Sequence, residues 1–313
     1  MDLKKLFPII GIGILLYIIS TLDSHQITQL FSQLPLHLVI LSFCIVFPLV
    51  LLTALEWQIL LKKQKIALSY RYSIKNIFIG YFYGFISPGG LGAYFRAFYV
   101  KQKSKSPLPK CVSNILIFNT IDYLSLLVLG VAGALFLSST APTLFLIILC
   151  LLVVVVVLFT LFLHKKTAQF LLAKLLQSQL VVSIRKKVHE PLDSFFEDLP
   201  KGQNIILPFF LSLGGWILRF TLLFLLTSSF QIQVPYLTFL FSMAIANVIA
   251  SLPISIYGLG TREATLISLL SVYGVPSENI VSLSLFWFIV IWLYPSIIGA
   301  VVTTREETTL QKQ

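Results

Sequence analysis

The fold of this chain is decided by Ser87–Arg96, a stretch that reads SPGGLGAYFR. A proline and three glycines stand close together there, and both residue types interrupt helices. Strongly apolar residues flank the stretch, and an arginine follows the last glycine by four positions. The sequence therefore places a broken helix and a cation inside a segment that is otherwise apolar enough to enter a membrane.

Composition places the whole chain in the membrane class. It has 313 residues, of which 57% are hydrophobic and 11% are charged, and its mean hydropathy is +0.93. A soluble domain carries about 25% charged residues. The apolar residues run in long blocks and do not alternate with polar ones as barrel strands require. We therefore predict an all-α, polytopic membrane helix bundle that forms a single transmembrane domain over residues 1–313.

Long apolar runs indicate six full spans, because a helix needs about 20 apolar residues to cross a bilayer. These runs cover 6–20, 36–61, 112–137, 142–163, 205–228 and 279–302. Two further apolar stretches, 74–101 and 236–273, are cut by SPGG and by LPISIYGLG, and the breaks are placed at Pro88, Gly89 and Pro253. Their arms are too short to span comfortably, so we predict two broken re-entrant hairpins, with eight spans as the alternative.

The net charge of +11 is distributed unevenly along the chain. All but three of the 23 lysines and arginines fall at the two ends of the chain and in the loops near 62–75, 101–110 and 164–203. Basic loops mark the cytoplasmic side of a membrane. We therefore predict a multi-pass cell-membrane protein with both termini in the cytoplasm and no nucleic-acid partner. Segment 164–203 is expected to be a cytoplasmic basic amphipathic loop on the membrane surface, or a solvated linker.

The two broken stretches share an order of glycines and prolines. Each has a Gly-Leu-Gly triplet, then a proline and then a glycine, at spacings of 17 and 24 residues in the first and 16 and 23 in the second. The two sets are Gly90, Gly92, Pro109, Gly133 and Gly258, Gly260, Pro276, Gly299. Because the two hairpins open toward opposite sides, we predict an inverted repeat of 36–137 and 205–302. Two unrelated kinked helices are the alternative.

Six ionisable residues lie within the apolar segments, where a charge costs about 2.5–3.5 kcal/mol at a helix centre and normally faces a partner or a wet cavity. Arg96 and Arg262 follow the glycine-rich breaks, where a restarting helix offers free N–H groups to an anion. Glu56 lies near the end of its span and can instead reach the interface. The predicted binding residues are Arg96, Arg262, Glu263, Arg219, Asp122, Gly90, Gly92, Gly258 and Gly260.

Simpler roles are open for these charged residues. Arg96 can extend to the cytoplasmic interface, and Arg262 can pair with an acid on another helix. Arg219 and Asp122 can form a structural ion pair. Because Arg262 and Glu263 are adjacent, we do not expect them to face each other on one helix.

The breaks also carry a family resemblance. Leu252–Glu263 resembles the Pro…Gly-Leu-Gly-x-Arg-Glu signature of the lysylphosphatidylglycerol synthase transmembrane-region family, a group of flippase-like membrane proteins. Pro88–Ala97 resembles the family's Pro…Gly-(Glu/Asp)-x-x-Arg-Ala element, although Ala93 stands where an acid is usual. The family includes the flippase part of the bacterial multiple peptide resistance factor. The likeness covers nearly the whole chain and implies lipid translocation or a related lipid-handling role.

We therefore expect a flippase or transporter for an anionic phospholipid or lipid-linked headgroup, with membrane lipids as its partners. Arg96 and Arg262 would hold the phosphate, and Asp122 and Glu263 would contact polar or amine groups. The sequence contains no metal-ligand spacing, nucleotide-binding loop or nucleophile motif, so we expect no catalysis, no cofactor and no metal.

Two other function classes are alternatives. One is a non-catalytic membrane partner of a separate lipid-modifying enzyme, and the other is a membrane glycosyl- or phospho-transferase of lipid-linked sugar metabolism. In the aminoacyl-lipid synthases a soluble transferase domain follows the membrane part, whereas this chain stops at Gln313, so we do not expect it to make lysyl-lipid alone. A homo-oligomer is a further option.

Overall fold

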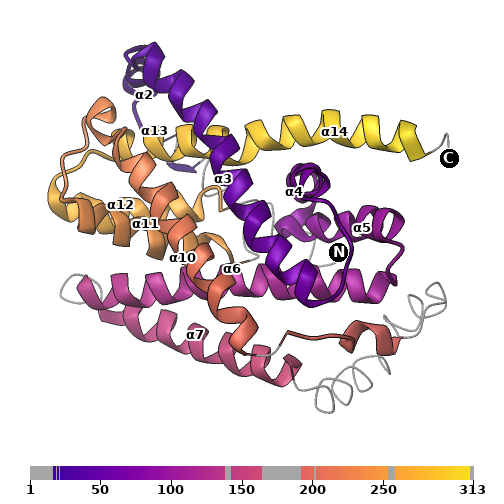
Figure 1. Cartoon of the computed structure of the whole chain (residues 1–313). Coiled ribbons are helices and arrows are strands. Elements are labelled where there is room, and N and C mark those ends of the chain that lie inside the picture. The colour runs from indigo at the N-terminus through magenta and orange to yellow at the C-terminus, as the bar shows by residue number, and fades with distance from the viewer. Residues whose placement is uncertain are drawn as a thin grey trace, which may run out of the picture.

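The computed structural model describes residues 17–18, 20, 22–137, 142–163, 192–200, 202–252 and 258–310. Over these residues every regular element is helical, and the helices pack into one bundle (Figure 1). The predicted all-α membrane helix bundle is confirmed.

Eleven α-helices make up most of the described residues. They are α2 (Ser24–Ser32), α3 (Leu36–Lys63), α4 (Tyr70–Phe85), α5 (Arg96–Ser104), α6 (Leu108–Phe136), α7 (Pro142–Leu163), α10 (Gln203–Phe224), α11 (Tyr236–Ala250), α12 (Thr261–Leu270), α13 (Ser277–Phe288) and α14 (Tyr294–Leu310). Short 3₁₀ segments cover Pro88–Phe95, Leu192–Phe196, Thr227–Phe230 and Ser271–Tyr273. A π-helical segment, Ile289–Leu293, joins α13 to α14 without a break.

Four of the described helices are long and apolar enough to cross a membrane: α3, α6, α10 and the continuous run Ser277–Glu307. They coincide with the predicted spans 36–61, 112–137, 205–228 and 279–302. The predicted span 142–163 corresponds to α7. The apolar helix within it, Leu146–Leu161, is shorter than the four spanning helices. Most of the predicted span 6–20, most of segment 164–203, and Pro253 lie outside the described residues.

Prolines fix where several of these helices begin. Pro35, Pro107, Pro235 and Pro276 immediately precede α3, α6, α11 and α13. A proline lacks the backbone N–H, and at a helix start that donor would have no intrahelical acceptor. The helices therefore start at sequence positions that cost them no hydrogen bond.

The first broken stretch folds as α4, the 3₁₀ segment Pro88–Phe95 and α5. Ser87 closes the break, because its hydroxyl accepts the Gly92 N–H at 2.6 Å and donates to the Gly84 carbonyl at 3.1 Å. A Cβ on Gly92 would overlap the Tyr83 carbonyl oxygen, so this close approach needs glycine. The break is thus a compact helical turn that contains Pro88, Gly89 and Gly90.

This turn changes what lies in front of Arg96. The backbone at Phe95 is already helical, with φ −59° and ψ −25°, so α5 continues directly from the 3₁₀ segment. A continuous helical turn therefore stands where the sequence predicted a free helix N-terminus at Arg96. Any anion bound there would be held by the arginine side chain and not by free backbone N–H groups.

Two glycines let the last span of each predicted half approach the other half. A Cβ on Gly133 of α6 would stand 3.0 Å from Phe241 of α11, and one on Gly299 of α14 would overlap the Phe78 carbonyl oxygen of α4. Small residues let helix backbones approach closely in membranes. Gly133 and Gly299 are also the pair that the predicted repeat matches. This reciprocal packing supports the inverted repeat, which stays a prediction.

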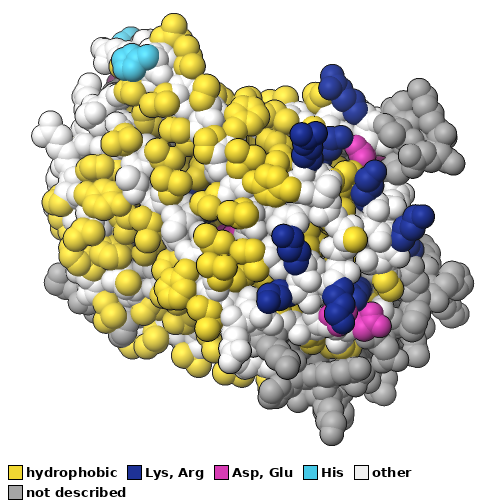
Figure 2. Space-filling view, viewed as in Figure 1, with side chains coloured by type: hydrophobic (Ala, Val, Ile, Leu, Met, Phe, Trp, Pro, Cys, Tyr) yellow, Lys and Arg dark blue, Asp and Glu magenta, His cyan; other side chains and the backbone are white. Residues whose placement is uncertain are grey.

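Charge and apolar surface are separated along the bundle. Lysine and arginine side chains gather on the right of Figure 2, at the end where α14 finishes, and apolar side chains cover the left and centre. Exposed apolar residues such as Leu41, Val157 and Phe210 contribute to a surface suited to lipid. The described residues thus have the charge asymmetry of a multi-pass membrane protein. Which end faces the cytoplasm stays a prediction.

Asp198 ties the described part of segment 164–203 to this basic end. Its carboxylate lies 2.7 Å from Lys65 Nζ and 2.8 Å from Lys110 Nζ. Hydrogen bonds from these two ammonium groups, with that of Lys110 the stronger, hold the pKa of the Asp198 carboxyl below its usual range. The segment is therefore attached to the start of α6 and to the turn after α3.

Candidate functional site

A cavity of about 210 Å³ lies where the predicted halves meet. Elements α3, α4, α5, α6, α10, α11, α13 and the π-helical segment all contribute to its wall. Its polar and charged lining residues are Thr53, Arg96, Asn119, Asp122, Arg219 and Asn247, and its aromatic ones are Tyr81, Phe118, Trp216, Trp287 and Trp292. Three of the predicted binding residues, Arg96, Asp122 and Arg219, thus come together from three different helices.

Arg96 is held in the cavity wall by aromatic rings. Its guanidinium carbon lies 4.7 Å from the centre of the Trp57 ring and 5.3 Å from that of Phe118, within the range of cation–π attraction. Gly80 of α4 makes room for it, since a Cβ there would stand 3.0 Å from Arg96 Cδ. Arg96 is only 5% exposed, so the alternative in which it extends to the cytoplasmic interface is wrong.

Hydrogen-bond donors of Arg96 are left unused. Its Nε is buried and has no hydrogen-bond partner among the described residues. None of the ion pairs formed between described residues includes Arg96. A buried guanidinium with free donors is an unsatisfied site for an anion.

Arg219 and Asp122 face the same cavity from α10 and α6. Arg219 Nη2 donates to Thr53 Oγ1 at 3.1 Å, and its guanidinium carbon lies 5.0 Å from the Trp216 ring centre. Asp122 Oδ1 accepts the Ser212 hydroxyl at 2.8 Å. The two charged groups do not form an ion pair in the described structure, so the structural pairing considered from the sequence is not found. Each charge is left able to act on a bound group.

Glu56 lies behind this cluster on α3. It is 3% exposed, and its Oε1 is buried without a hydrogen-bond partner among the described residues. It lies within electrostatic range of Asp122 and Arg219. The expectation that Glu56 reaches the membrane interface is therefore wrong, because its position on α3 turns the carboxyl into the bundle.

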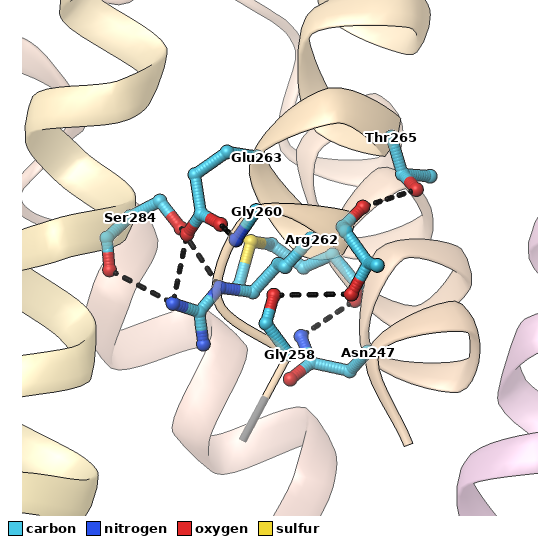
Figure 3. Close-up of polar contacts among 9 residues, drawn as sticks. Asn247, Gly258, Gly260, Arg262, Glu263, Thr265 and Ser284 are labelled. Carbon is cyan, nitrogen blue, oxygen red and sulfur yellow. Dashed lines mark hydrogen bonds and ion pairs between the residues drawn. The ribbon is translucent and has the colours of Figure 1, made fainter. Parts of the chain in front are cut away.

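The described residues at the end of the second break, Gly258–Gly260, form a hydrogen-bonded group with the start of α12 (Figure 3). Gly258 and Gly260 have φ values of +79° and +84°, which glycine adopts readily, and α12 starts just after them. Glu263 Oε2 accepts the Gly260 N–H at 2.6 Å and so caps the helix. The partial positive charge at this helix end, predicted to bind an external anion, is thus met by a carboxylate of the chain itself.

Arg262 belongs to the same hydrogen-bonded group. Its Nη2 lies 2.9 Å from Glu263 Oε1, and its Nε donates to Ser284 Oγ of α13 at 2.8 Å. Both Arg262 and Glu263 are 0% exposed. The expectation that these neighbours do not face each other is wrong, because Glu263 folds back to cap Gly260 and the long arginine side chain reaches it. None of these residues lines the cavity.

Sequence reasoning missed the aromatic part of the site. Three of the four tryptophans, Trp216, Trp287 and Trp292, line the cavity, and the fourth, Trp57, stacks on Arg96. Trp57 directly follows Glu56, and Trp216 stands three positions before Arg219, so rare tryptophans beside membrane charges were an available signal. The π-helical segment carries Trp292 into the wall, and such segments are frequent at functional sites.

Comparison with known proteins agrees with the motifs at the two breaks. No curated protein matches the chain. The family model described as the lysylphosphatidylglycerol synthase TM region matches residues 8–299, which is most of the chain. The protein therefore belongs to the lysylphosphatidylglycerol synthase transmembrane-region family, as the residues around Pro88 and Gly258 predicted.

Proposed function

We propose that this membrane protein is a flippase or transporter that carries the headgroup of an anionic phospholipid, or a lipid-linked headgroup, across the bilayer. The observation that carries the proposal is Arg96, a buried arginine with free donors that faces a cavity containing Arg219 and Asp122. The family supports a lipid-related function in the membrane.

The chemistry of the cavity suits a phosphodiester. Arginine presents several N–H donors in one plane, which matches the oxygens of a phosphate better than a lysine ammonium does. Arg219 supplies a second cation, and Asp122 is the one acid among the described lining residues. Together these lining residues carry one excess positive charge, which complements the single negative charge of a phosphodiester.

The size of the cavity suits a headgroup and not a whole lipid. Sites for drug-sized ligands usually have about 300–1,000 Å³, whereas this cavity has about 210 Å³. Acyl chains would therefore stay in the surrounding bilayer while the headgroup occupies the cavity. The aromatic wall, including Trp216 and Trp292, lowers the local dielectric and so strengthens the electrostatic attraction between arginine and phosphate.

Catalysis is not part of this proposal. Among the described residues no group of three or more histidine, cysteine, aspartate or glutamate side chains is placed to hold a metal ion. A role as a non-catalytic partner of a separate lipid-modifying enzyme is the second candidate, favoured only by the synthase in the family's description. A catalytic role would require a donor substrate, which the test below omits.

The test is leaflet exchange of a fluorescent phosphatidylglycerol in proteoliposomes, followed by quenching of the outer leaflet with dithionite. We expect exchange with the wild type and its loss in Arg96→Gln. Arg71→Gln is the matched control, because Arg71 is exposed on α4 and outside the cavity. Exchange equal to that of empty vesicles would contradict the flippase and favour the partner role. Full exchange in folded Arg96→Gln would contradict the assigned site.

A further inference from the structure

One face of α3 organises the charged part of the cavity. Thr53, Glu56 and Trp57 stand three and four positions apart, so they share a face of the helix. Thr53 accepts a hydrogen bond from Arg219, and Trp57 stacks on Arg96. Glu56 lies on the same face, immediately before Trp57 in the sequence. The Glu56 carboxyl therefore lies behind the cavity wall, within electrostatic range of Arg219 but without a hydrogen bond or ion pair to it among the described residues.

The surroundings of Glu56 favour its neutral form. Its carboxyl is buried, and its Oε1 lacks any donor among the described residues, so an ionised group would lose its hydration without full compensation. The charged groups that act on it are Asp122 from α6, which repels a second negative charge, and Arg219 from α10, which attracts one. Arg96 from α5 is directed to the neighbouring Trp57.

Among the described cavity-lining residues, the remaining elements add no further charge. Element α4 contributes Tyr81, α11 contributes Asn247, and α13 with the π-helical segment contributes Trp287 and Trp292. With Glu56 protonated, two guanidinium groups and the Asp122 carboxylate leave one positive charge, the complement of a phosphodiester. With Glu56 ionised, the cluster is neutral and a second carboxylate opposes the phosphate.

We propose that Glu56 is a proton-binding site, and that the cavity binds a phosphate-bearing headgroup only when Glu56 carries its proton. This inference rests on the proposed function, and it adds that the protein takes up one proton for each anion that it binds. The proton comes from water, bonds to a carboxylate oxygen of Glu56, and returns to water when the headgroup has left and the group ionises. No other bond changes.

Linkage gives this inference a definite sign. If the protonated form binds the headgroup, then the headgroup strengthens proton binding by the same factor as the proton strengthens headgroup binding. Affinity for the anion is then constant at low pH and falls as pH rises through the titration of Glu56. For a single linked proton the dissociation constant rises by about tenfold per pH unit on the alkaline side.

The experiment is a titration of purified protein with dioctanoyl-phosphatidylglycerol between pH 6 and pH 10. Intrinsic tryptophan fluorescence reports binding, because all four tryptophans lie in or beside the cavity. We expect wild-type affinity to fall at alkaline pH and Glu56→Gln to keep the low-pH affinity throughout. Glu197→Gln makes the same chemical change at an exposed site and should follow the wild type.

The outcomes separate the two proposals. No binding by wild type at any pH overturns the proposed function and this inference with it. Binding that does not change with pH, or a pH dependence that persists in Glu56→Gln, overturns the proton site and leaves the proposed function standing. Asp122→Asn serves as the second variant, and we expect its lipid affinity to keep the pH dependence. If Asp122→Asn loses the pH dependence while Glu56→Gln keeps it, the proton belongs to Asp122 instead.

Discussion

Arg96 and Arg262 follow similar breaks in the sequence, yet only Arg262 is paired with a carboxylate among the described residues. Arg262 bonds to Glu263 and Ser284 through Nη2 and Nε, and the Glu263 carboxylate also caps Gly260, while Arg262 Nη1 is buried without a partner among the described residues. Arg96 stacks on aromatic rings and keeps its Nε free. The charge of Arg262 is therefore compensated within the chain and lies outside the cavity lining, whereas Arg96 lines the cavity without a paired acid among the described residues.

The pair at the second break predicts a stability effect. Glu263→Gln can still accept the Gly260 N–H, but it leaves Arg262 as a buried, uncompensated charge. Removing one partner of a buried ion pair typically costs about 3–5 kcal/mol. We expect a large fall in the midpoint of thermal unfolding in detergent, with Glu278→Gln as the control at a partly exposed helix start.

The same variant also tests the anion site that the sequence predicted at Arg262. Phosphatidylglycerol binding measured on the folded fraction of Glu263→Gln should match the wild type, because neither residue lines the cavity. Wild-type stability combined with lost lipid binding would contradict the structural role and return Arg262 and Glu263 to the binding site.

At the level of elements, the close crossing of α14 over α4 depends on one residue. A Cβ on Gly299 would overlap a backbone oxygen of Phe78, so Gly299→Ala must move one helix away from the other. Such overpacking typically costs about 1–3 kcal/mol. Gly133→Ala meets Phe241 at 3.0 Å and should cost less, and Gly214→Ala on α10, which meets nothing within 4 Å, should cost nothing.

Thermal unfolding of the three variants in one detergent checks this order. An equal gain in all three would show that the higher helix propensity of alanine, and not the crossing, sets the effect. Stability unchanged in Gly299→Ala would contradict the close approach of α14 and α4.

Elements were more predictable from the sequence than their contacts. Spans such as 36–61 and 112–137 follow from long apolar runs, because the bilayer length imposes one helix length on them. The turn at Pro88–Phe95 was predicted as a break, but its 3₁₀ continuity depends on the Ser87 hydroxyl, which no periodicity reveals. The inward direction of Glu56 and its proximity to Asp122 and Arg219 depend on how α3, α6 and α10 pack, and that is a property of the tertiary structure.

At the scale of the whole molecule, the cavity depends on both predicted halves. Thr53, Arg96 and Asp122 come from the first, and Arg219 and Trp292 come from the second. An inverted repeat would place equivalent broken helices on opposite sides of one central site, an arrangement that many transporters use for alternating access. In this chain the two breaks differ, because among the described residues only the first contributes its arginine to the cavity.

The orientation of the bundle gives the last prediction, argued from the basic end of Figure 2. Gln102 of α5 lies among the basic residues, and Ser228 lies in a turn after α10 that carries none; both are exposed. Since basic loops stay in the cytoplasm, a membrane-impermeant maleimide added to intact cells should label Ser228→Cys at once and Gln102→Cys only after permeabilisation. The background replaces Cys44, Cys111 and Cys150. Reversed labelling would show that the bundle has the opposite orientation in the membrane, and it would leave the assignment of the cavity unchanged. Labelling of both sites from outside would place α5 and the turn after α10 on the same side of the membrane, which contradicts an α10 that spans it.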